Sequence, residues 1–279
     1  MNIAIIGLGL IGGSLGLKLK SLGHHVTGIP RREETIDEAV RIGAIDIGTT
    51  DHNVGVKDAD IIFICVPINL TAPIFGEIGG ALKKGAIVID VASSKHEIVS
   101  QIDKITPKGI YFIGGHPMAG KETVKLSAAE ANLFEGKTWI LTPTSKTSKK
   151  ALEKIKETII QLGCKAVEMD PRLHDLVVAG ISHMPLAIAV SLVNAVSSAQ
   201  KGKEEMKLAA SSGFRDTTRI ASGDPILGVD MFKTNRKAVL QMISAFKKSL
   251  GNLEKLIKEG NAEKIKEELE RAKQFRDSI

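Results

Sequence analysis

The sequence predicts an α/β N-terminal domain with a mostly parallel, doubly wound sheet, followed by an all-α C-terminal domain. Short runs rich in Ile and Val alternate with helical patterns up to Pro171, and after it only helical periodicity remains. A glycine-rich loop directly follows the first apolar run. We therefore expect one domain over residues 1–171 and a second over residues 172–279.

The expected strands are apolar runs without alternation, which is typical of strands covered by helices on both faces of a parallel sheet. They lie at residues 2–7, 25–29, 59–66, 85–91, 109–115, 138–143 and 164–170. Helical patterns at residues 11–21 and 31–43 separate the first three runs. In the second half, helical periodicity covers residues 174–196, 203–214, 229–260 and 262–275.

Composition indicates a globular protein and argues against a nucleic-acid binder. Of the 279 residues, 43% are hydrophobic and 25% charged, which is an ordinary globular profile. The net charge of +6 is spread through Lys-rich helical stretches that also carry Glu, so we interpret it as solvated helix faces with some attraction for anionic ligands. Aromatic residues make up only 4%, which leaves little material for base stacking.

Cysteine usage and the N-terminus favour a reducing, cytoplasmic location. Cys65 and Cys164 lie in apolar runs, and the sequence shows neither a disulfide framework nor metal-ligand spacing. The N-terminus lacks the basic region of a signal peptide. Residues Leu176 to Gln200 carry no charged side chain and are long enough to span a bilayer. Because His183 and Pro185 interrupt them, we expect a helix buried inside the protein or in a subunit interface.

The loop GLGLIGG, at residues 7–13, has the G-x-G-x-x-G spacing of a dinucleotide-binding Rossmann domain. Gly7 permits a tight turn, Gly9 lets backbone amides approach a pyrophosphate, and Gly12 lets helix and strand pack closely. The expected cofactor-binding residues of this loop are Gly7, Leu8, Gly9, Leu10, Ile11 and Gly12. A glycine-rich turn without a ligand is disfavoured by the position of the loop after the first strand.

The end of the second strand favours NADP over NAD. NAD-binding proteins usually carry an acidic residue there for the ribose 2′-hydroxyl, whereas this chain has Ile29 and Pro30, followed by Arg31 and Arg32. The missing acid and the two guanidinium groups suit a 2′-phosphate. Alternatively, both arginines are solvated residues at the start of a helix, paired with the glutamates that follow.

Later strands end in residues that we expect on the ligand-binding edge of the sheet. Val66 and Pro67 end one run and are expected beside the cofactor. Ser94 has S-x-x-E spacing with Glu97 and is expected to cap the next helix. Ser93 is then either a turn serine or a site residue.

His116 lies in the segment GGHPMAGKE, at the carboxyl end of the strand that follows. A strand-end histidine by itself is more often structural than catalytic. On the same rim as a dinucleotide, however, imidazole is the natural base for a hydroxyl proton during hydride transfer. This combination predicts a dehydrogenase.

Seven segments carry a resemblance to a known family: GLGLIGGSL, DVASSK, GGHPMAG, NLF, LTPT, ISHMP and SSGFRDTTR. In this order they resemble the prephenate and arogenate dehydrogenases of tyrosine biosynthesis, over most of the chain. The chain is most similar to the short, NADP-using, arogenate-type members. The resemblance implies oxidative decarboxylation of a cyclohexadienol, in which hydride passes to nicotinamide, CO2 leaves and the ring becomes aromatic.

The resemblance also implies roles for individual residues. His116 would accept the proton of the C4 hydroxyl, and Ser93 would hydrogen-bond to this histidine or to that hydroxyl. Arg219 would bind the ring carboxylate, and His183 would line the pocket from the helical domain. Arg215 adds a second cation beside a site that must hold a carboxylated substrate.

Two positions depart from the pattern of relatives. Lys121 stands where many relatives have Thr or Ser, and Gly228 stands where some have Trp. Both are near the family's pocket for the substrate side chain, so the choice between prephenate and arogenate stays open. Lys121 is a candidate partner for the side-chain carboxylate that both molecules carry.

There are two alternatives, one within the dehydrogenases and one from a nonenzymatic class. A β-hydroxyacid-type dehydrogenase would need a catalytic lysine in the helical domain, and none stands out in Leu176 to Gln200. A nonenzymatic NADP-binding sensor or dimerisation module would have no need for Ser93, His116 and Arg219 together. We further expect a homodimer through the helical domain, because a charge-free helix of this length is hard to cover with the remaining helices alone.

Overall fold

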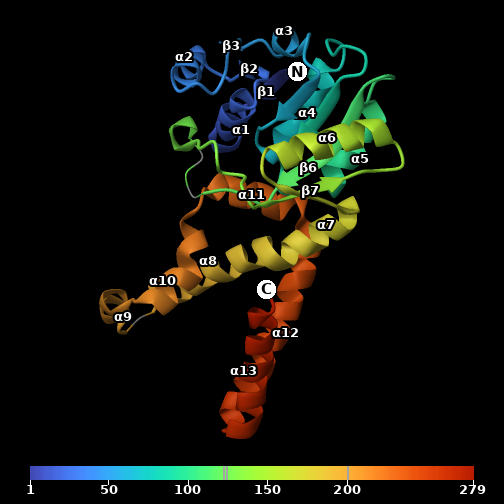
Figure 1. Ribbon diagram of the computed structural model, residues 1–279. Helices are drawn as coiled ribbons and strands as arrows, with labels where there is room; N and C mark the ends of the chain where they lie inside the picture. Colours follow the sequence, from blue (N-terminus) through green and yellow to red (C-terminus); the bar gives the residue numbers. More distant parts are fainter. Residues whose placement is uncertain (122, 124, 200) are drawn as a thin grey trace.

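The computed structural model describes residues 1–121, 123, 125–199 and 201–279. Glu122, the last residue of GGHPMAGKE, and Gln200, the end of the charge-free segment, lie outside the described residues. Figure 1 shows a sheet surrounded by helices in the N-terminal half and long helices that extend away from it in the C-terminal half. The expected α/β domain followed by an all-α domain is confirmed.

Eight strands form one sheet in the order β3-β2-β1-β4-β5-β6-β7-β8. Their bounds are β1 Asn2–Ile6, β2 His25–Ile29, β3 Ile47–Gly48, β4 Ile61–Ile64, β5 Ile87–Asp90, β6 Tyr111–Pro117, β7 Thr138–Thr142 and β8 Lys165–Glu168. Neighbouring strands are parallel except β6 and β7. The order reverses between β1 and β4, and open α/β sheets bind ligands at the carboxyl ends of strands beside such a reversal.

Helices cover both faces of this sheet. They are α1 Leu10–Ser21, α2 Glu33–Arg41, α3 His52–Val56, α4 Ile68–Ile78, α5 His96–Ile105 and α6 Lys149–Gln161, with a 3-10 turn at Leu126–Ala128. Alternate side chains of β1 enter two separate cores, with Ile3 and Ile5 packed in the core that includes α1 and α6, and Ala4 and Ile6 in the core that includes α4 and α5. The apolar runs therefore lack alternation because both faces are buried.

Strand β6 is longer than its apolar run suggested. It continues through Pro117, and His116 pairs with Ile140 of the antiparallel β7. A glycine is required at Gly115, because a Cβ there would lie 2.6 Å from the backbone oxygen of Asp90. His116 thus lies within the end of a strand, and pairing with β7 holds its backbone in place.

The C-terminal half is helical throughout its described residues. Its elements are α7 Pro171–Val178, a π-helical turn Ala179–His183, α8 Met184–Ser197, α9 Lys203–Ala209, α10 Ser212–Thr218, a 3-10 turn Arg219–Ser222, α11 Pro225–Thr234, α12 Arg236–Glu259 and α13 Ala262–Asp277. In Figure 1, α8 with α9 and α10 forms one arm and α12 with α13 another. The π-helical turn ends two residues before Pro185, whose missing N–H interrupts the helical hydrogen bonds there.

The run Pro171–Ser197 is, within the described parts of the chain, the one helix long and apolar enough to cross a membrane by length and composition. Its most apolar 18-residue window has a mean hydropathy of 2.1, and 22% of that window is buried. The expectation that this helix is buried inside a single chain is therefore wrong. Its alternative, a subunit interface, remains a prediction.

The helical half contributes almost nothing to the two cores. All buried members of both cores lie between Ile3 and Cys164, and Met231 is the one described residue of the helical half that packs against them. Large apolar side chains are exposed along the helical half instead, among them Ile181, Leu240, Leu250, Leu269 and Phe275.

Candidate active site

The glycine loop lies between β1 and α1, beside the reversal in strand order. Gly7 has a φ of +91°, and a Cβ on it would lie 2.3 Å from the backbone oxygen of Cys65. A Cβ on Gly12 would lie 2.0 Å from the oxygen of Gly7. Both positions therefore require glycine, because any side chain would push the loop away from β4 and α1.

The N-terminus of α1 fits a phosphate group. Gly9 precedes the helix, and no side chain among the described residues caps its first turn with a hydrogen bond. Leu8 and Leu10 are buried in the core and Ile11 packs against it, so the loop presents backbone amides to the rim. Uncapped amides at a helix N-terminus, together with the helix dipole, favour an anion.

The other expected cofactor residues surround this loop. Val66 is half-buried, and its Cγ1 would lie 3.2 Å from a Cβ on Gly7, while Pro67 is exposed at the start of α4. Arg31 and Arg32 are exposed just before α2. Neither arginine forms an ion pair with any described residue. Both are solvated, but the alternative pairing with the glutamates that follow is absent from the described structure.

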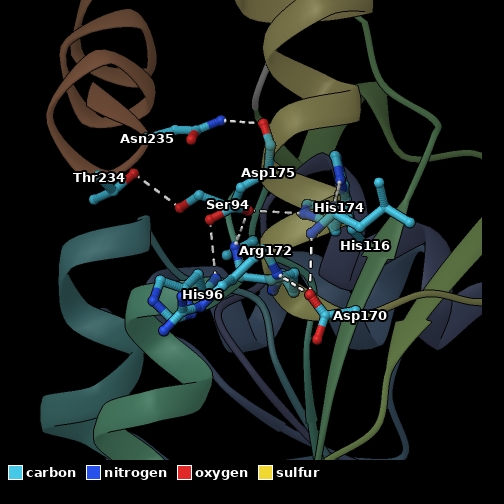
Figure 2. A network of polar contacts seen from close by, with 12 residues as sticks. Ser94, His96, His116, Asp170, Arg172, His174, Asp175, Thr234 and Asn235 are labelled. Carbon is cyan, nitrogen blue, oxygen red and sulfur yellow. Dashed lines mark hydrogen bonds and ion pairs between the residues drawn. The ribbon is translucent and has the colours of Figure 1, made fainter. Parts of the chain in front are cut away.

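His116 is buried and belongs to a chain of hydrogen bonds (Figure 2). Its Nδ1 lies 2.9 Å from Nε2 of His174, whose Nδ1 lies 2.9 Å from Oδ1 of Asp175. The pKa of His116 is held well below its usual value, first by burial and then by the neighbouring His174, Lys95 and His183. The imidazole is therefore neutral at pH 7 and able to accept a proton.

The two serines that follow β5 have different surroundings. The Ser93 hydroxyl is buried and has no hydrogen-bond partner among the described residues. Ser94 Oγ lies 2.8 Å from Oγ1 of Thr234. The expected capping of α5 by Ser94 is wrong, because the Asp175 carboxylate accepts the backbone N–H groups of Lys95 and His96 at 2.7 and 3.0 Å. A full negative charge at this helix start takes the place of a hydroxyl.

A buried ion pair joins Lys95 to Asp90. The Asp90 carboxylate also accepts the backbone N–H groups of Ala92 and Gly115, both at 3.0 Å. Burial lowers the pKa of Lys95, and the attraction of Asp90 opposes this shift. The pair ties the turn that carries Ser93 to β6 near His116, since Gly115 immediately precedes this histidine.

His183 reaches the same region from the π-helical turn. Its Nδ1 lies 3.2 Å from Nδ2 of Asn235, an amide that also donates to the backbone oxygen of Asp175 at 2.7 Å. Since this amide nitrogen is a donor, His183 Nδ1 accepts, and the ring proton lies on Nε2. That atom is buried without a partner in the described structure. Burial lowers the pKa of His183 to about 4, so the ring is neutral.

The predicted cationic residues lie outside this buried cluster. Lys121 Nζ lies 2.5 Å from Glu130 Oε1, and Arg215 Nε donates to the backbone oxygen of Ala210 at 3.2 Å. Arg219 is exposed at the start of the 3-10 turn that follows α10. The structure thus brings His116 and His183 into one network with the turn of Ser93, and it does not bring Lys121 or Arg215 into it.

Sequence reasoning missed His174, Asp175, Lys95, Asp90 and Asn235. Two signals were present: an Asp inside the apolar run IVID, and an adjacent His and Asp at the start of an otherwise charge-free helix. Buried charges of this kind are rare unless they are paired. No described group of three or more His, Cys, Asp or Glu side chains is arranged to hold a metal ion.

The chain matches two family models, "Prephenate dehydrogenase, nucleotide-binding domain" over residues 15–168 and "Prephenate dehydrogenase, dimerization domain" over residues 170–271. The prephenate dehydrogenase of Bacillus subtilis (strain 168) is 33% identical over 281 residues, which cover 100% of this chain and 76% of that protein. The two family models together cover nearly the whole chain, and the match to the Bacillus subtilis enzyme covers all of it.

Two solved structures are similar along their full length. Prephenate dehydrogenase from Aquifex aeolicus, in complex with hydroxyphenyl propionate and NAD+, superimposes with a TM-score of 0.93 at 34% identity, covering 100% of this chain and 98% of that one. Synechocystis arogenate dehydrogenase gives a TM-score of 0.88 at 35% identity, covering 100% and 99%. The chain therefore belongs to the prephenate/arogenate dehydrogenase family, the NAD(P)-dependent oxidoreductases of tyrosine biosynthesis.

Proposed function

We propose that this enzyme oxidises and decarboxylates prephenate or arogenate with NADP in preference to NAD, and that His116 is its catalytic base. One observation carries the assignment of the site. Around the buried, neutral His116, two buried polar atoms, Ser93 Oγ and His183 Nε2, have no partner among the described residues. Unsatisfied buried polar groups are costly, so their presence supports a ligand that completes them.

In this proposal His116 accepts the proton of the C4 hydroxyl. When bound, the dinucleotide supplies the acceptor for the hydride of the same ring carbon. Ser93 donates to or accepts from the reacting hydroxyl and keeps it directed at the imidazole. Loss of the ring carboxylate as CO2 makes the ring aromatic, and His116 returns its proton to the phenol oxygen.

His183 acts as a neutral donor. Its proton lies on Nε2, and burial keeps the ring from gaining a second one until about pH 4. A buried neutral donor can bind a substrate oxygen without the cost of burying another charge.

Arg219 is proposed to bind the ring carboxylate, because its planar guanidinium matches a carboxylate with two parallel hydrogen bonds. Arg215 and Lys121 remain candidates for the substrate's second carboxylate. Lys121 pairs with Glu130, and Arg215 donates to Ala210 through Nε alone. Each of these cations has further N–H donors for a carboxylate.

The cofactor proposal rests on the loop and on the end of β2. The positions that only glycine can occupy and the uncapped start of α1 fit the pyrophosphate. At the end of β2, Arg31 and Arg32 are exposed and lack carboxylate partners in the described structure, so a 2′-phosphate is a suitable ligand for them.

We also propose a cytoplasmic homodimer formed by the helical half, whose match is to a dimerization domain. Its exposed apolar side chains and its small share of the cores are typical of a subunit interface. A second subunit would cover the apolar run Pro171–Ser197 without a membrane.

Initial rates with prephenate and arogenate, each with NADP and NAD, test this proposal directly. A dominant rate with NADP and one of the two substrates is the expected result. Dominant rates with NAD would overturn the cofactor assignment. No rate in any combination, for protein that still binds NADP, would overturn the catalytic assignment.

A further inference from the structure

We propose that His174 and Asp175 are positioning residues that hold the ring proton of His116 on Nδ1 and so leave Nε2 as the basic atom. The inference rests on the proposed role of His116 and adds the means by which this base acquires the correct tautomer. The three side chains form one continuous path of hydrogen bonds from β6 to α7 (Figure 2).

The direction of this path follows from the groups that can only donate. Backbone N–H groups of Lys95 and His96 donate to Oδ1 and Oδ2 of Asp175, which marks both carboxylate oxygens as acceptors. The contact between Asp175 Oδ1 and His174 Nδ1, at 2.9 Å, therefore requires the proton on the histidine. With one ring proton, which Asp175 holds on Nδ1, His174 has an unshared pair on Nε2.

The second contact follows from the first. His174 Nε2 accepts, so its partner His116 Nδ1, at 2.9 Å, must donate. A neutral imidazole carries one N–H, and hence the Nε2 of His116 is left with an unshared pair. This arrangement is less common than the reverse, because a neutral histidine in water favours the proton on Nε2. Without His174, the ring would present N–H to the hydroxyl whose proton it must take.

The carboxylate is held independently of the histidines. Asp175 belongs to α7, but its carboxylate lies at the start of α5, where the helix dipole favours a negative charge. Its backbone oxygen accepts from Asn235. When His116 becomes an imidazolium during the reaction, its Nδ1–H bond to His174 is supported by this fixed negative charge. A carboxylate that orients a catalytic histidine and stabilises its cation is a recurrent device in enzymes.

Two substitutions separate this role from simple packing. His174→Gln can place its amide oxygen where Nε2 now lies and accept from His116 Nδ1–H, whereas His174→Phe fills the space without an acceptor. We expect His174→Phe to lower kcat by about 100-fold or more, the usual contribution of a general base, with little change in KM. His174→Gln should recover most of the loss. Thr158→Val, which removes a partly buried hydrogen bond within α6, controls for stability.

Nitrogen NMR of ¹⁵N-histidine-labelled enzyme reads the tautomer without turnover. His116→Gln and His174→Gln spectra assign the two rings. We expect His116 to carry its proton on Nδ1 in the unsubstituted enzyme and on Nε2 in His174→Phe. If His174→Phe does not fold, the spectrum of the unsubstituted enzyme and the kcat of His174→Gln test the tautomer assignment instead.

A proton on Nε2 of His116 in the unsubstituted enzyme would overturn the inference, as would equal kcat values for the Gln and Phe variants. If the unsubstituted enzyme turned over neither substrate while the spectrum showed Nδ1–H, the proposed function would fail but the tautomer assignment would hold.

Discussion

His116 and His174 share a hydrogen bond of 2.9 Å although they are 58 residues apart in the sequence. One lies on the sixth strand of the nucleotide-binding half, and the other on the first helix of the helical half. The proposed base is therefore completed only when the two halves pack together.

Removal of the proposed base should abolish turnover. His116→Asn is expected to lower kcat by about 100- to 10,000-fold, because the hydroxyl proton loses its acceptor. Binding of NADP, measured by fluorescence titration, should be unchanged, since the glycine loop is untouched. Near-normal turnover would remove His116 from its role.

Arg219 should matter for substrate affinity. A charge-assisted hydrogen bond contributes about 1.5–3 kcal/mol, so Arg219→Gln is expected to raise the substrate KM about 10- to 100-fold. Arg271→Gln, which alters an exposed arginine on α13, serves as the matched control. An unchanged KM for Arg219→Gln would place the carboxylate partner elsewhere.

Cofactor choice should depend on the two arginines after β2. The double variant Arg31→Ala/Arg32→Ala is expected to raise the KM for NADP by about tenfold or more and to leave the KM for NAD nearly unchanged, since NAD has no 2′-phosphate. Steady-state rates with each cofactor measure this. Equal changes for both cofactors would argue against a 2′-phosphate site.

Buried neutral histidines should make stability depend on pH. Burial lowers the pKa of His183 from 6.5 to about 4, and the pKa of His116 is lowered as well. Between pH 6.5 and about 4, His183 binds a proton in the unfolded chain but not in the folded protein. The free energy of unfolding therefore falls as the pH falls through this range. His183 alone accounts for about 3 kcal/mol between pH 6.5 and 4.

Urea unfolding over this pH range measures the effect. His183→Gln should have a shallower dependence on pH than the unsubstituted protein, whatever its stability at pH 7. An identical slope in the two proteins would show that His183 is not neutral and buried in solution.

The dimer can be tested with two isoleucines of similar exposure. Ile181, in the helical half, is 64% exposed, and Ile160, on α6, is 61% exposed. Light scattering should give twice the chain mass of 29.8 kDa for the unsubstituted protein and for Ile160→Lys. Ile181→Lys should shift the mass toward that of the monomer. A monomeric unsubstituted protein would contradict the proposed dimer.

Local patterns were sufficient for much of this molecule. The apolar runs predicted seven of the eight strands, because most of these residues are buried on both faces and leave no polar alternation. The two-residue strand β3 was missed. Glycine spacing predicted the cofactor loop, since the left-handed φ of Gly7 and the close approach at Gly12 are demands that single residues must meet. The charge-free helix could be recognised, but whether it was covered could not be, because burial depends on partners outside the segment.

Local patterns did not predict the hydrogen-bond network around His116. Ser94 has the spacing of a helix cap, yet Asp175, 80 residues from Lys95, caps α5 instead. A carboxylate held at the helix start replaces the local hydroxyl once α7 packs against α5. The buried pairing of Lys95 with Asp90 was equally hidden, because an isolated lysine in a sequence is usually a solvated one.

The sequence by itself determined the two-domain architecture, the nucleotide loop and the family, because these depend on periodicity and on residue types at short spacings. Only the tertiary structure decided which side chains surround His116, which of them is the helix cap and which face of the helical half is left uncovered. Those choices depend on the packing of two domains against each other, and such packing joins residues whose separation along the chain carries no local signal.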